Sequence, residues 1–286
     1  MYVYLNGDYV DRGDAAIPVD DRGFLFGDAV YEALRASQGR IFEAERHMAR
    51  MRHGLDTLRF GHASLIDDLL GAAARLLELN ALREREALVY MHVSRGVAPR
   101  KHAFPAADTA PTVFVAASPF APKAGVCAEG AAAITHPDLR WARCDLKTTN
   151  LLANVLANQA AQEAGAYEAI LIREGVVTEG THCNVFAVVG GELRTHPLGE
   201  RILRGVTRDV VIELARDRGW TVREDAVRED ELRAADEVFL TGTTTDVMPI
   251  VRLDGTPVRD GRPGLIASEL RDALAALMAD QAVGSG

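Results

Sequence analysis

The sequence predicts an α+β protein with two domains. Its 286 residues exceed the usual size of a single domain. Segments that alternate like strands are mixed with segments of helical spacing, and their order is not that of a βαβ series. A stretch with Pro119, Pro122 and Gly125 has neither periodicity. We therefore expect a small N-terminal α/β domain over residues 1–118, a linker at 119–125, and a larger domain of mixed sheets and helices over 126–286.

The first domain is expected to open with a hairpin, in which Tyr2 to Leu5 alternates and Asn6-Gly7 provides a two-residue turn. A turn that leads into a strand follows within residues 20–36. Helical spacing predicts two helices, and alternation predicts two strands on either side of a loop rich in charge, glycine and proline. The helices are expected at 43–59 and 65–79, the second capped by Ser64, the strands at 87–94 and 111–117, and the loop at 95–110.

The second domain combines hairpins with helices. A predicted helix at 149–164 ends at Gly165, and its apolar side carries Leu151, Leu152, Val155 and Leu156. Another helix is expected at 207–218, before Gly219. The remaining elements are predicted as strands at 169–172, 176–177, 184–189, 192–195, 221–223 and 237–240, and as helices at 229–235 and 263–278.

Composition limits the class of function. The chain is 48% hydrophobic and 26% charged with a net charge of -9, which predicts a soluble globular protein and argues against a general nucleic-acid binder. Three distant cysteines, Cys127, Cys144 and Cys183, fit neither a disulfide framework nor a zinc site. The N-terminus does not resemble a signal peptide, and no apolar run is long enough to span a membrane. We expect a cytoplasmic protein with no metal and no membrane partner.

The use of lysine points to a reactive amine. Three of the 32 basic residues are lysines, at positions 101, 123 and 147. Arginine keeps its charge in proteins, whereas a lysine amine can act as a nucleophile and form a Schiff base. Lys147 lies just before the predicted helix at 149–164 and is the best candidate for such an amine. Chance in an arginine-rich chain is the alternative explanation.

Two segments have the composition of a phosphate site. The loop at 199–207 brings a glycine, backbone N–H groups and a hydroxyl to the start of a predicted helix, where the helix dipole favours an anion. Residues 241–245 read Thr-Gly-Thr-Thr-Thr after a predicted strand and could form an anion nest. An ordinary helix start or turn is the alternative for each segment.

Three further sets of charged residues suit a ligand. Arg50 and His47 lie one turn apart on a predicted helix and can point the same way, although a surface charge is the alternative. Glu179 at a strand end needs a partner if it is buried, and either a protonated pyridine nitrogen or a structural arginine would serve. Arg100 and His102 alternate in an extended loop, so both can face one carboxylate unless the loop is a mobile basic surface.

Together these segments resemble the fold-type IV enzymes that depend on pyridoxal 5′-phosphate (PLP), the superfamily of the branched-chain aminotransferases, and the match is closest to the D-amino-acid aminotransferase group. The resemblance covers nearly the whole chain. It depends on several motifs in order: Asp21-Arg22-Gly23 with Phe26-Gly27-Asp28 and Tyr31-Glu32, Arg100-Lys101-His102 before Phe104-Pro105, Arg143-Cys144-Asp145-Leu146-Lys147, Thr178-Glu179-Gly180 with Asn184-Val185-Phe186, and Gly205-Val206-Thr207-Arg208-Asp209.

The resemblance implies a role for each candidate residue. Lys147 would form the Schiff base with PLP and carry the proton between the substrate α-carbon and the cofactor C4′, while Glu179 would keep the pyridine nitrogen protonated. Leu203 would support the ring. The phosphate would be bound by Arg50, Val206, Thr207 and Thr243. The substrate carboxylate would be bound by Tyr31, Arg100 and His102, the last two supplied by the partner subunit of a homodimer.

The implied reaction is a transamination between D-amino acids and 2-oxo acids. A branched-chain L-amino-acid transaminase, an (R)-amine transaminase and an aminodeoxychorismate lyase are the alternatives on the same fold, and Arg100 with His102 argues against them. A non-catalytic protein that binds phosphate ligands is the alternative from another class. Two positions depart from the family pattern and bear on cofactor affinity and substrate range: Gly242 replaces a serine, and Thr181-His182-Cys183 replaces a serine-rich stretch.

Overall fold

The computed structural model describes residues 1–61 and 66–283, and the chain divides into two compact units. Unit 1 consists of Met1–Ala121, Leu146–Asn150 and Ala279–Gly286, and unit 2 of Pro122–Asp145 and Leu151–Met278. The first division falls inside the segment 119–125 that the sequence indicated as a linker. The segments at 146–150 and 279–286, which were expected in the second domain, group with unit 1.

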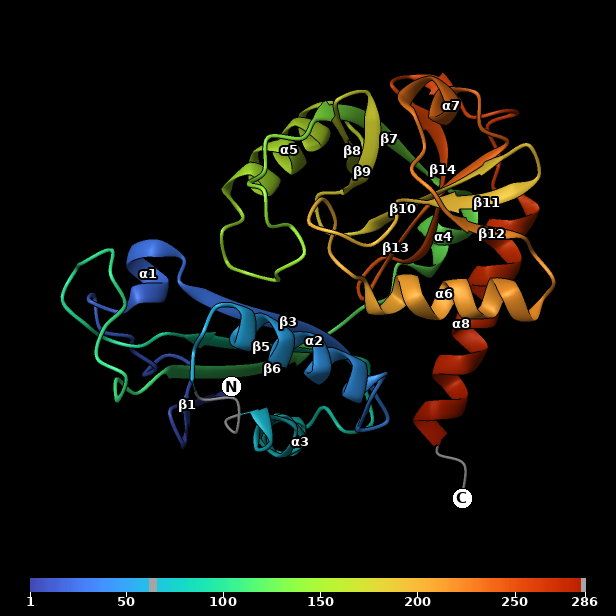
Figure 1. The fold of residues 1–286 in the computed structure, drawn as a ribbon. Coiled ribbons are helices and arrows are strands. Elements are labelled where there is room, and N and C mark those ends of the chain that lie inside the picture. Colours follow the sequence, from blue (N-terminus) through green and yellow to red (C-terminus); the bar gives the residue numbers. More distant parts are fainter. Residues whose placement is uncertain (62–65, 284–286) are drawn as a thin grey trace. The chain divides into compact units, whose positions relative to one another are not determined.

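Unit 1 is built on a six-stranded sheet with the order β2-β1-β6-β5-β3-β4 (Figure 1). Asn6 and Gly7 both have positive φ angles, 53° and 105°, which confirms the predicted hairpin turn. The predicted cap Ser64 lies outside the described residues. The strands are β1 Tyr2–Leu5, β2 Asp8–Asp11, β3 Ala29–Ser37, β4 Arg40–Ile41, β5 Ala87–Ser94 and β6 Thr112–Pro119, and the helices are α1 Arg22–Phe26, α2 Ala44–Thr57 and α3 Leu69–Leu79.

The core of unit 1 lies between this sheet and the apolar sides of α2 and α3. Alternation along β3 directs Val30 and Leu34 into the core. Glu32 shares their side of the strand and is fully buried under α2. Tyr31 therefore faces the opposite side of the sheet. Two adjacent residues of β3, Tyr31 and Glu32, thus lie in different environments.

Unit 2 contains a nine-stranded sheet in the order β12-β11-β10-β13-β14-β7-β8-β9, with β15 paired to β14 (Figure 1). The strands are β7 Ala131–Pro137, β8 Glu168–Arg173, β9 Val176–Gly180, β10 Asn184–Val189, β11 Glu192–Thr195, β12 Val222–Glu224, β13 Glu237–Gly242, β14 Asp246–Leu253 and β15 Thr256–Pro257. The helices are α4 Ala124–Glu129, α5 Leu152–Glu163, α6 Val206–Asp217, α7 Glu229–Arg233 and α8 Leu265–Val283, whose residues from Ala279 onward group with unit 1.

Two central strands of unit 2 were missed from the sequence, and the reason is local composition. β7 begins with three alanines, which have little intrinsic preference for strands. β14 contains Pro249, which argues against an interior strand because it removes a ladder donor. Both are specified by their neighbours, since β7 pairs with β14 and β8 in parallel. Tertiary pairing therefore overrides weak local preference here.

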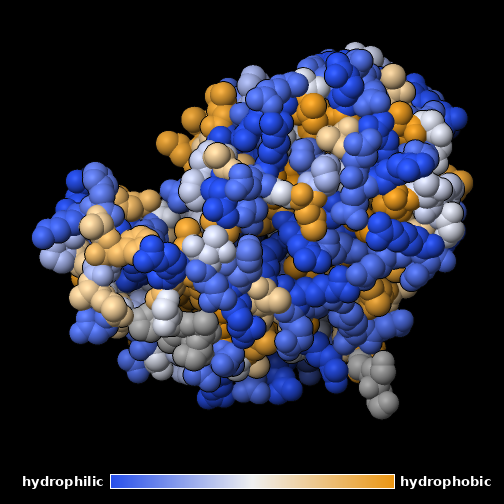
Figure 2. Space-filling model, in the orientation of Figure 1, coloured by the Kyte–Doolittle hydropathy of each residue, from blue (hydrophilic) through white to orange (hydrophobic). Residues whose placement is uncertain are grey.

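Helix α5 turns its large apolar side chains outward. Leu152, Val155 and Leu156 are exposed, whereas Ala157 and Ala161 pack with a small cluster against β8. The helix itself was predicted, and its apolar side is now seen to lie on the surface of the chain. Figure 2 shows hydrophobic residues, in orange, on the side of unit 2 where α5 lies. Within residues 1–61 and 66–283, no helix combines the length and apolar character that a membrane span requires.

Candidate active site

The candidate residues fall into two groups, one in each unit. In unit 1, the segment that carries Lys147 runs along the start of β3. The backbone N–H of Tyr31 donates to the Lys147 carbonyl at 3.0 Å, and the N–H of Thr149 donates to the Ala29 carbonyl at 3.2 Å. These bonds fix the lysine backbone, and Lys147 Nζ lies 4.4 Å from the centre of the Tyr31 ring. The structure thus brings the predicted amine beside a predicted substrate residue.

Arg50 is held by a buried carboxylate. Arg50 Nε donates to Glu32 Oε1 and Arg50 Nη2 to Glu32 Oε2, both at 2.7 Å. His47 Nδ1 lies 2.8 Å from Glu32 Oε2, so the two α2 residues share one partner on β3. Burial disfavours the charge of Glu32, yet Arg50 and then His47 outweigh it and bring the pKa of Glu32 to about 2. Burial lowers the pKa of His47, which favours a neutral imidazole.

Arg100 and His102 lie beside the same aromatic ring in unit 1. The Arg100 guanidinium is 5.3 Å from the centre of the Phe26 ring, and the His102 ring is 5.7 Å from it. The chain bends at Arg100 and at His102, so both side chains approach one ring without the extended alternation that was expected. A guanidinium and an imidazole near one ring can together hold a planar carboxylate.

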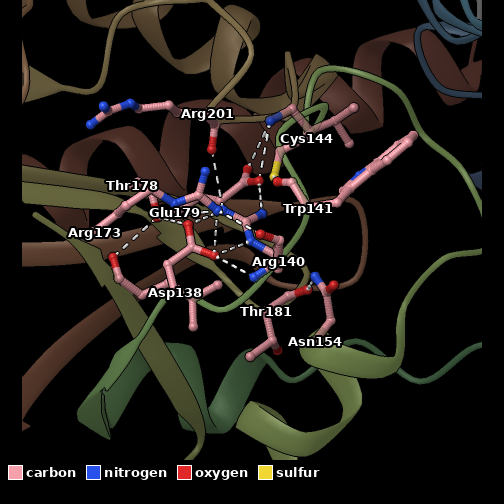
Figure 3. Close-up of polar contacts among 12 residues, drawn as sticks. Asp138, Arg140, Trp141, Cys144, Asn154, Arg173, Thr178, Glu179, Thr181 and Arg201 are labelled. Carbon is pink, nitrogen blue, oxygen red and sulfur yellow. Dashed lines mark hydrogen bonds and ion pairs between the residues drawn. The ribbon is translucent and has the colours of Figure 1, made fainter.

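In unit 2, Glu179 is the centre of a buried ionic network (Figure 3). Arg140 donates to Glu179 Oε1 through Nη1, and Asn184 Nδ2 donates to Glu179 Oε2 at 3.1 Å. The N–H of Leu203 also donates to the carboxylate, at 3.1 and 3.2 Å from its two oxygens. Burial raises the pKa of Glu179, and Arg140 opposes this rise more than any other neighbour.

Arg140 is itself clamped by a second carboxylate. Asp138 accepts from Arg140 Nε and Nη2, each at 2.9 Å, and forms an ion pair with Arg173 at 3.0 Å. Burial acts against the charge of Asp138, but Arg140 lowers its pKa to about 2. Glu179, Arg140, Asp138 and Arg173 therefore form a row of alternating charges that balance one another, which is the condition for keeping charges in a protein interior.

The register of β9 explains how two adjacent residues join this network. Ile170 pairs with Gly180 and Ile172 with Val177, so Thr178 and Glu179 lie opposite Leu171 alone. Such a bulge bends the strand and re-aims side chains. Thr178 Oγ1 consequently donates to Asp138 Oδ2 at 2.9 Å while Glu179 meets Arg140.

The two predicted phosphate segments also lie in unit 2. Helix α6 begins at Val206 and Thr207 after Gly205, and in the part of the chain that is described no side chain caps its first N–H groups. Thr243 lies in the turn between β13 and β14. Near the end of β13, just before this turn, Thr241 Oγ1 is buried and makes no hydrogen bond to any described residue. Uncapped N–H groups and an unsatisfied buried hydroxyl both favour an added acceptor.

These features fit PLP, whose phosphate can accept from helix N–H groups and whose pyridinium can donate to a carboxylate. Three donors reach Glu179, and a carboxylate offers about four acceptor positions, so a further donor can be accommodated. Among the described residues, no group of three or more His, Cys, Asp or Glu side chains is placed to hold a metal ion.

The positions that depart from the family pattern have local explanations. His182 Nδ1 lies 2.9 Å from Glu168 Oε2, and Glu168 is fully buried. Thr181 Oγ1 donates to the other oxygen of Glu168 at 2.6 Å, so the replaced stretch is tied to β8. At Gly242 a side chain would meet Thr245 Oγ1 at 3.3 Å, which is a tight contact.

Asp138 and Arg140, which hold Glu179 in place, were not predicted from the sequence, and Asn184 was noted only within a family motif. A structural arginine was expected as one possible partner of Glu179, but many arginines of the chain could have taken that place. The sequence carries only a weak indication of this pair. Asp138 and Arg140 are oppositely charged residues two positions apart after a strand, a pattern that also suits an exposed turn.

The fold and these residues place the chain in a known class. The family model for amino-transferase class IV matches residues 29–253, so the chain belongs to this family and is a PLP-dependent enzyme of the aminotransferase type. Over 279 residues it is 41% identical to the D-alanine aminotransferase of Bacillus licheniformis, covering 96% of each chain.

Solved structures agree on the fold. The chain is similar to the branched-chain amino acid aminotransferase of Escherichia coli, with a TM-score of 0.89, 28% identity, and coverage of 97% of this chain and 94% of that one. The branched-chain aminotransferase of the archaeon Thermoproteus uzoniensis, solved with norvaline, gives a TM-score of 0.85 at 27% identity, with coverage of 98% of this chain and 95% of that one.

Proposed function

We propose that this protein transfers the amino group of a D-amino acid to a 2-oxo acid, with D-alanine among its donors. The observation that carries the proposal is the 41% identity to a D-alanine aminotransferase over 96% of both chains. Identity to the branched-chain enzymes is lower, at 28% and 27%, although their fold is the same. A branched-chain L-amino-acid substrate is therefore the less favoured alternative.

Lys147 is proposed as the catalytic residue. When bound, PLP supplies an aldehyde that captures the amino group and a ring that takes up the electron pair of the α-carbon. Lys147 would bind the cofactor through Nζ, and as a free amine it would remove the α-proton of the substrate and return it at C4′. Its fixed backbone and its place beside Tyr31 support this role.

Glu179 is proposed to hold a proton on the ring nitrogen. A carboxylate that stays ionised in a buried place attracts a proton on a neighbouring base. Its hydrogen bonds from Arg140, Asn184 and Leu203 fix its orientation and support the role. Leu203, which supplies one of these donors, is proposed to lie against the ring.

The remaining candidates are proposed to bind anions. Uncapped N–H groups at α6 and the anchored guanidinium of Arg50 support a phosphate site. This site would consist of Arg50, Val206, Thr207 and Thr243. Tyr31, Arg100 and His102 are proposed to bind the substrate carboxylate, which would present the α-hydrogen of the D form to the lysine.

We further propose that the chain works as a cytoplasmic homodimer in which Arg100 and His102 serve the partner subunit's site. The exposed apolar side of α5 supports an interface between copies, since Leu152, Val155 and Leu156 are 73%, 58% and 61% exposed. Charged and polar residues would be expected at these positions on a helix that faces water.

The proposal is tested by a spectral half-reaction. Holoenzyme mixed with D-alanine should lose the absorbance of its PLP form and gain that of the pyridoxamine form, whereas L-alanine should leave it unchanged. Reduction with borohydride followed by peptide mapping should label Lys147. Conversion by L-alanine alone, or label on another residue, would contradict the assignment of substrate or of lysine respectively.

A further inference from the structure

A charged cluster at the start of unit 1 anchors the loop that carries Arg100 and His102. Asp28 Oδ2 accepts from Arg22 Nε at 2.8 Å and from Arg95 Nε at 2.9 Å, while Asp28 Oδ1 accepts from Arg95 Nη2 at 3.0 Å. The side chains of Arg22 and Arg95 are only 4% and 8% exposed. One carboxylate thus holds two buried guanidinium groups, an arrangement with strict geometric demands.

Arg22 connects Asp28 to the backbone of the loop through hydrogen bonds. Its Nη1 donates to the Lys101 carbonyl at 2.7 Å and to the Ala103 carbonyl at 3.3 Å. These two carbonyls flank His102, and Lys101 follows Arg100 directly. The guanidinium of Arg22 also lies 4.8 Å from the Phe26 ring, the same ring that Arg100 and His102 approach. Phe26 and the loop therefore share one support.

Arg95 fixes the beginning of the loop in the same way. It donates to the carbonyls of Leu58 and Arg59 at 2.9 and 3.1 Å and stacks on Phe60 and Phe104, whose ring centres are 4.2 and 3.9 Å away. Loops of this length and composition are commonly mobile. Here buried ion pairs to a single carboxylate replace the missing secondary structure.

We propose that Asp28 and Arg22 are positioning residues for carboxylate recognition: Asp28 orients Arg22, and Arg22 sets the loop backbone so that Arg100 and His102 hold one geometry before a carboxylate binds. This rests on the proposed function, because it deepens the role given there to Arg100 and His102. Preorganised donors bind more tightly because little order is left to impose on binding. The site would select ligands that carry a carboxylate over those that lack one.

The test measures carboxylate binding apart from cofactor binding. Propionate, which is D-alanine without its amino group, is titrated into wild-type and Asp28→Asn holoenzyme by calorimetry. The dissociation constant should rise about tenfold or more, which is the effect of losing about one charge-assisted hydrogen bond to the carboxylate. The PLP affinity of the apoenzyme should stay within about twofold of the wild type. This change is well below the tenfold change expected for propionate, which corresponds to about 1.4 kcal/mol.

Hydrogen exchange provides a readout that does not depend on activity. Amides at 100–104 should exchange faster in Asp28→Asn than in the wild type, because the loop loses its anchor. Glu86→Gln is the matched control, since it breaks another ion pair of unit 1, the 2.8 Å contact with Arg35, without touching the loop. In that control the propionate affinity and the exchange at 100–104 should both stay at wild-type values.

A second variant keeps the test decisive if Asp28→Asn does not fold. Arg22→Met retains an apolar stem beside Phe26 but removes the donors to Lys101 and Ala103, so it should also weaken propionate binding. Faster exchange in the loop together with unchanged propionate affinity would overturn the proposal. If wild-type holoenzyme does not react with D-alanine, the proposed function is wrong. The propionate and exchange measurements would still decide whether Asp28 positions a carboxylate site.

Discussion

Glu179 is a buried carboxylate surrounded by hydrogen-bond donors. Burial raises its pKa in the folded protein. Ionising Glu179 therefore lowers the free energy of unfolding, and this loss accumulates as the pH rises from the pKa of the unfolded chain to that of the folded protein. Arg140 reduces that effect, and Asp138 with Arg173 keeps Arg140 in place. The orientation of the Glu179 carboxylate is thus fixed by hydrogen bonds within the protein itself.

Glu32 shows the opposite sign and gives a pH-dependent prediction. Its folded pKa of about 2 lies below the usual 4.5, so its stabilising contribution is present above pH 4.5 and is lost as the pH falls toward 2. Glu32→Gln should therefore lower the free energy of unfolding at pH 7 by about 3 kcal/mol, a figure that follows from the size of the shift. Urea unfolding followed by circular dichroism at pH 7, 5 and 3.5 measures the difference.

The difference between wild type and Glu32→Gln should stay level from pH 7 to 5 and shrink at pH 3.5. Glu78→Gln is the control, because Glu78 pairs with Arg75 and Arg83 on the surface and should contribute little at any pH. A difference that grows toward low pH would show that the ionised form of Glu32 is not the stabilising one.

At the scale of elements, the start of α6 couples the phosphate segment to Glu179. Gly205 precedes the helix in an extended conformation that any residue can adopt, with φ of -71°. A Cβ at this position would overlap Asn184 Oδ1 and would lie 3.2 Å from Arg208 Cβ. The glycine is therefore required for space rather than for backbone freedom, and Asn184 in turn holds Glu179 and the Leu203 carbonyl.

Gly205→Ala should displace Asn184 and remove its hydrogen bond to Glu179. We expect a loss of about 1–3 kcal/mol in unfolding free energy, the usual range for overpacking and for unsatisfied buried groups. PLP affinity of the apoenzyme, followed by fluorescence, should fall as well. Gly199→Ala is the matched control, since no atom lies within 4 Å of its added Cβ. Equal melting temperatures for the two variants would contradict the steric argument.

Elements also mark how far sequence patterns reach. The opening hairpin and helices α2, α5 and α6 follow from turn residues and apolar spacing, which act within a few residues. β7 and β14 could not be found in this way, because alanines and Pro249 say little about a strand whose neighbours determine it. The bulge in β9 is equally invisible, since it depends on the register with β8.

At the scale of the whole molecule, the exposed apolar side of α5 predicts self-association. Val155→Asp would place a charge in the proposed interface and should shift the sedimentation of the protein from dimer toward monomer at micromolar concentration. Gln162→Asp adds the same charge to an exposed polar position of α5 and should leave the dimer intact. Monomeric wild-type protein, or equal sedimentation of both variants, would rule out this face as the interface.

The sequence by itself determined the family resemblance, the candidate lysine and most local elements, because each depends on residue types and spacings within short segments. Only the tertiary structure decided that Arg140 meets Glu179, that Glu32 anchors Arg50, and that Asp28 supports the loop with Arg100 and His102. The ion pairs among these contacts join residues from 6 to 67 positions apart in the chain. The physical reason is that strand register and burial decide which charged side chains lie within reach of each other. By sequence alone, many arginines are equally suitable partners for each carboxylate, and only the fold places one or two of them beside it.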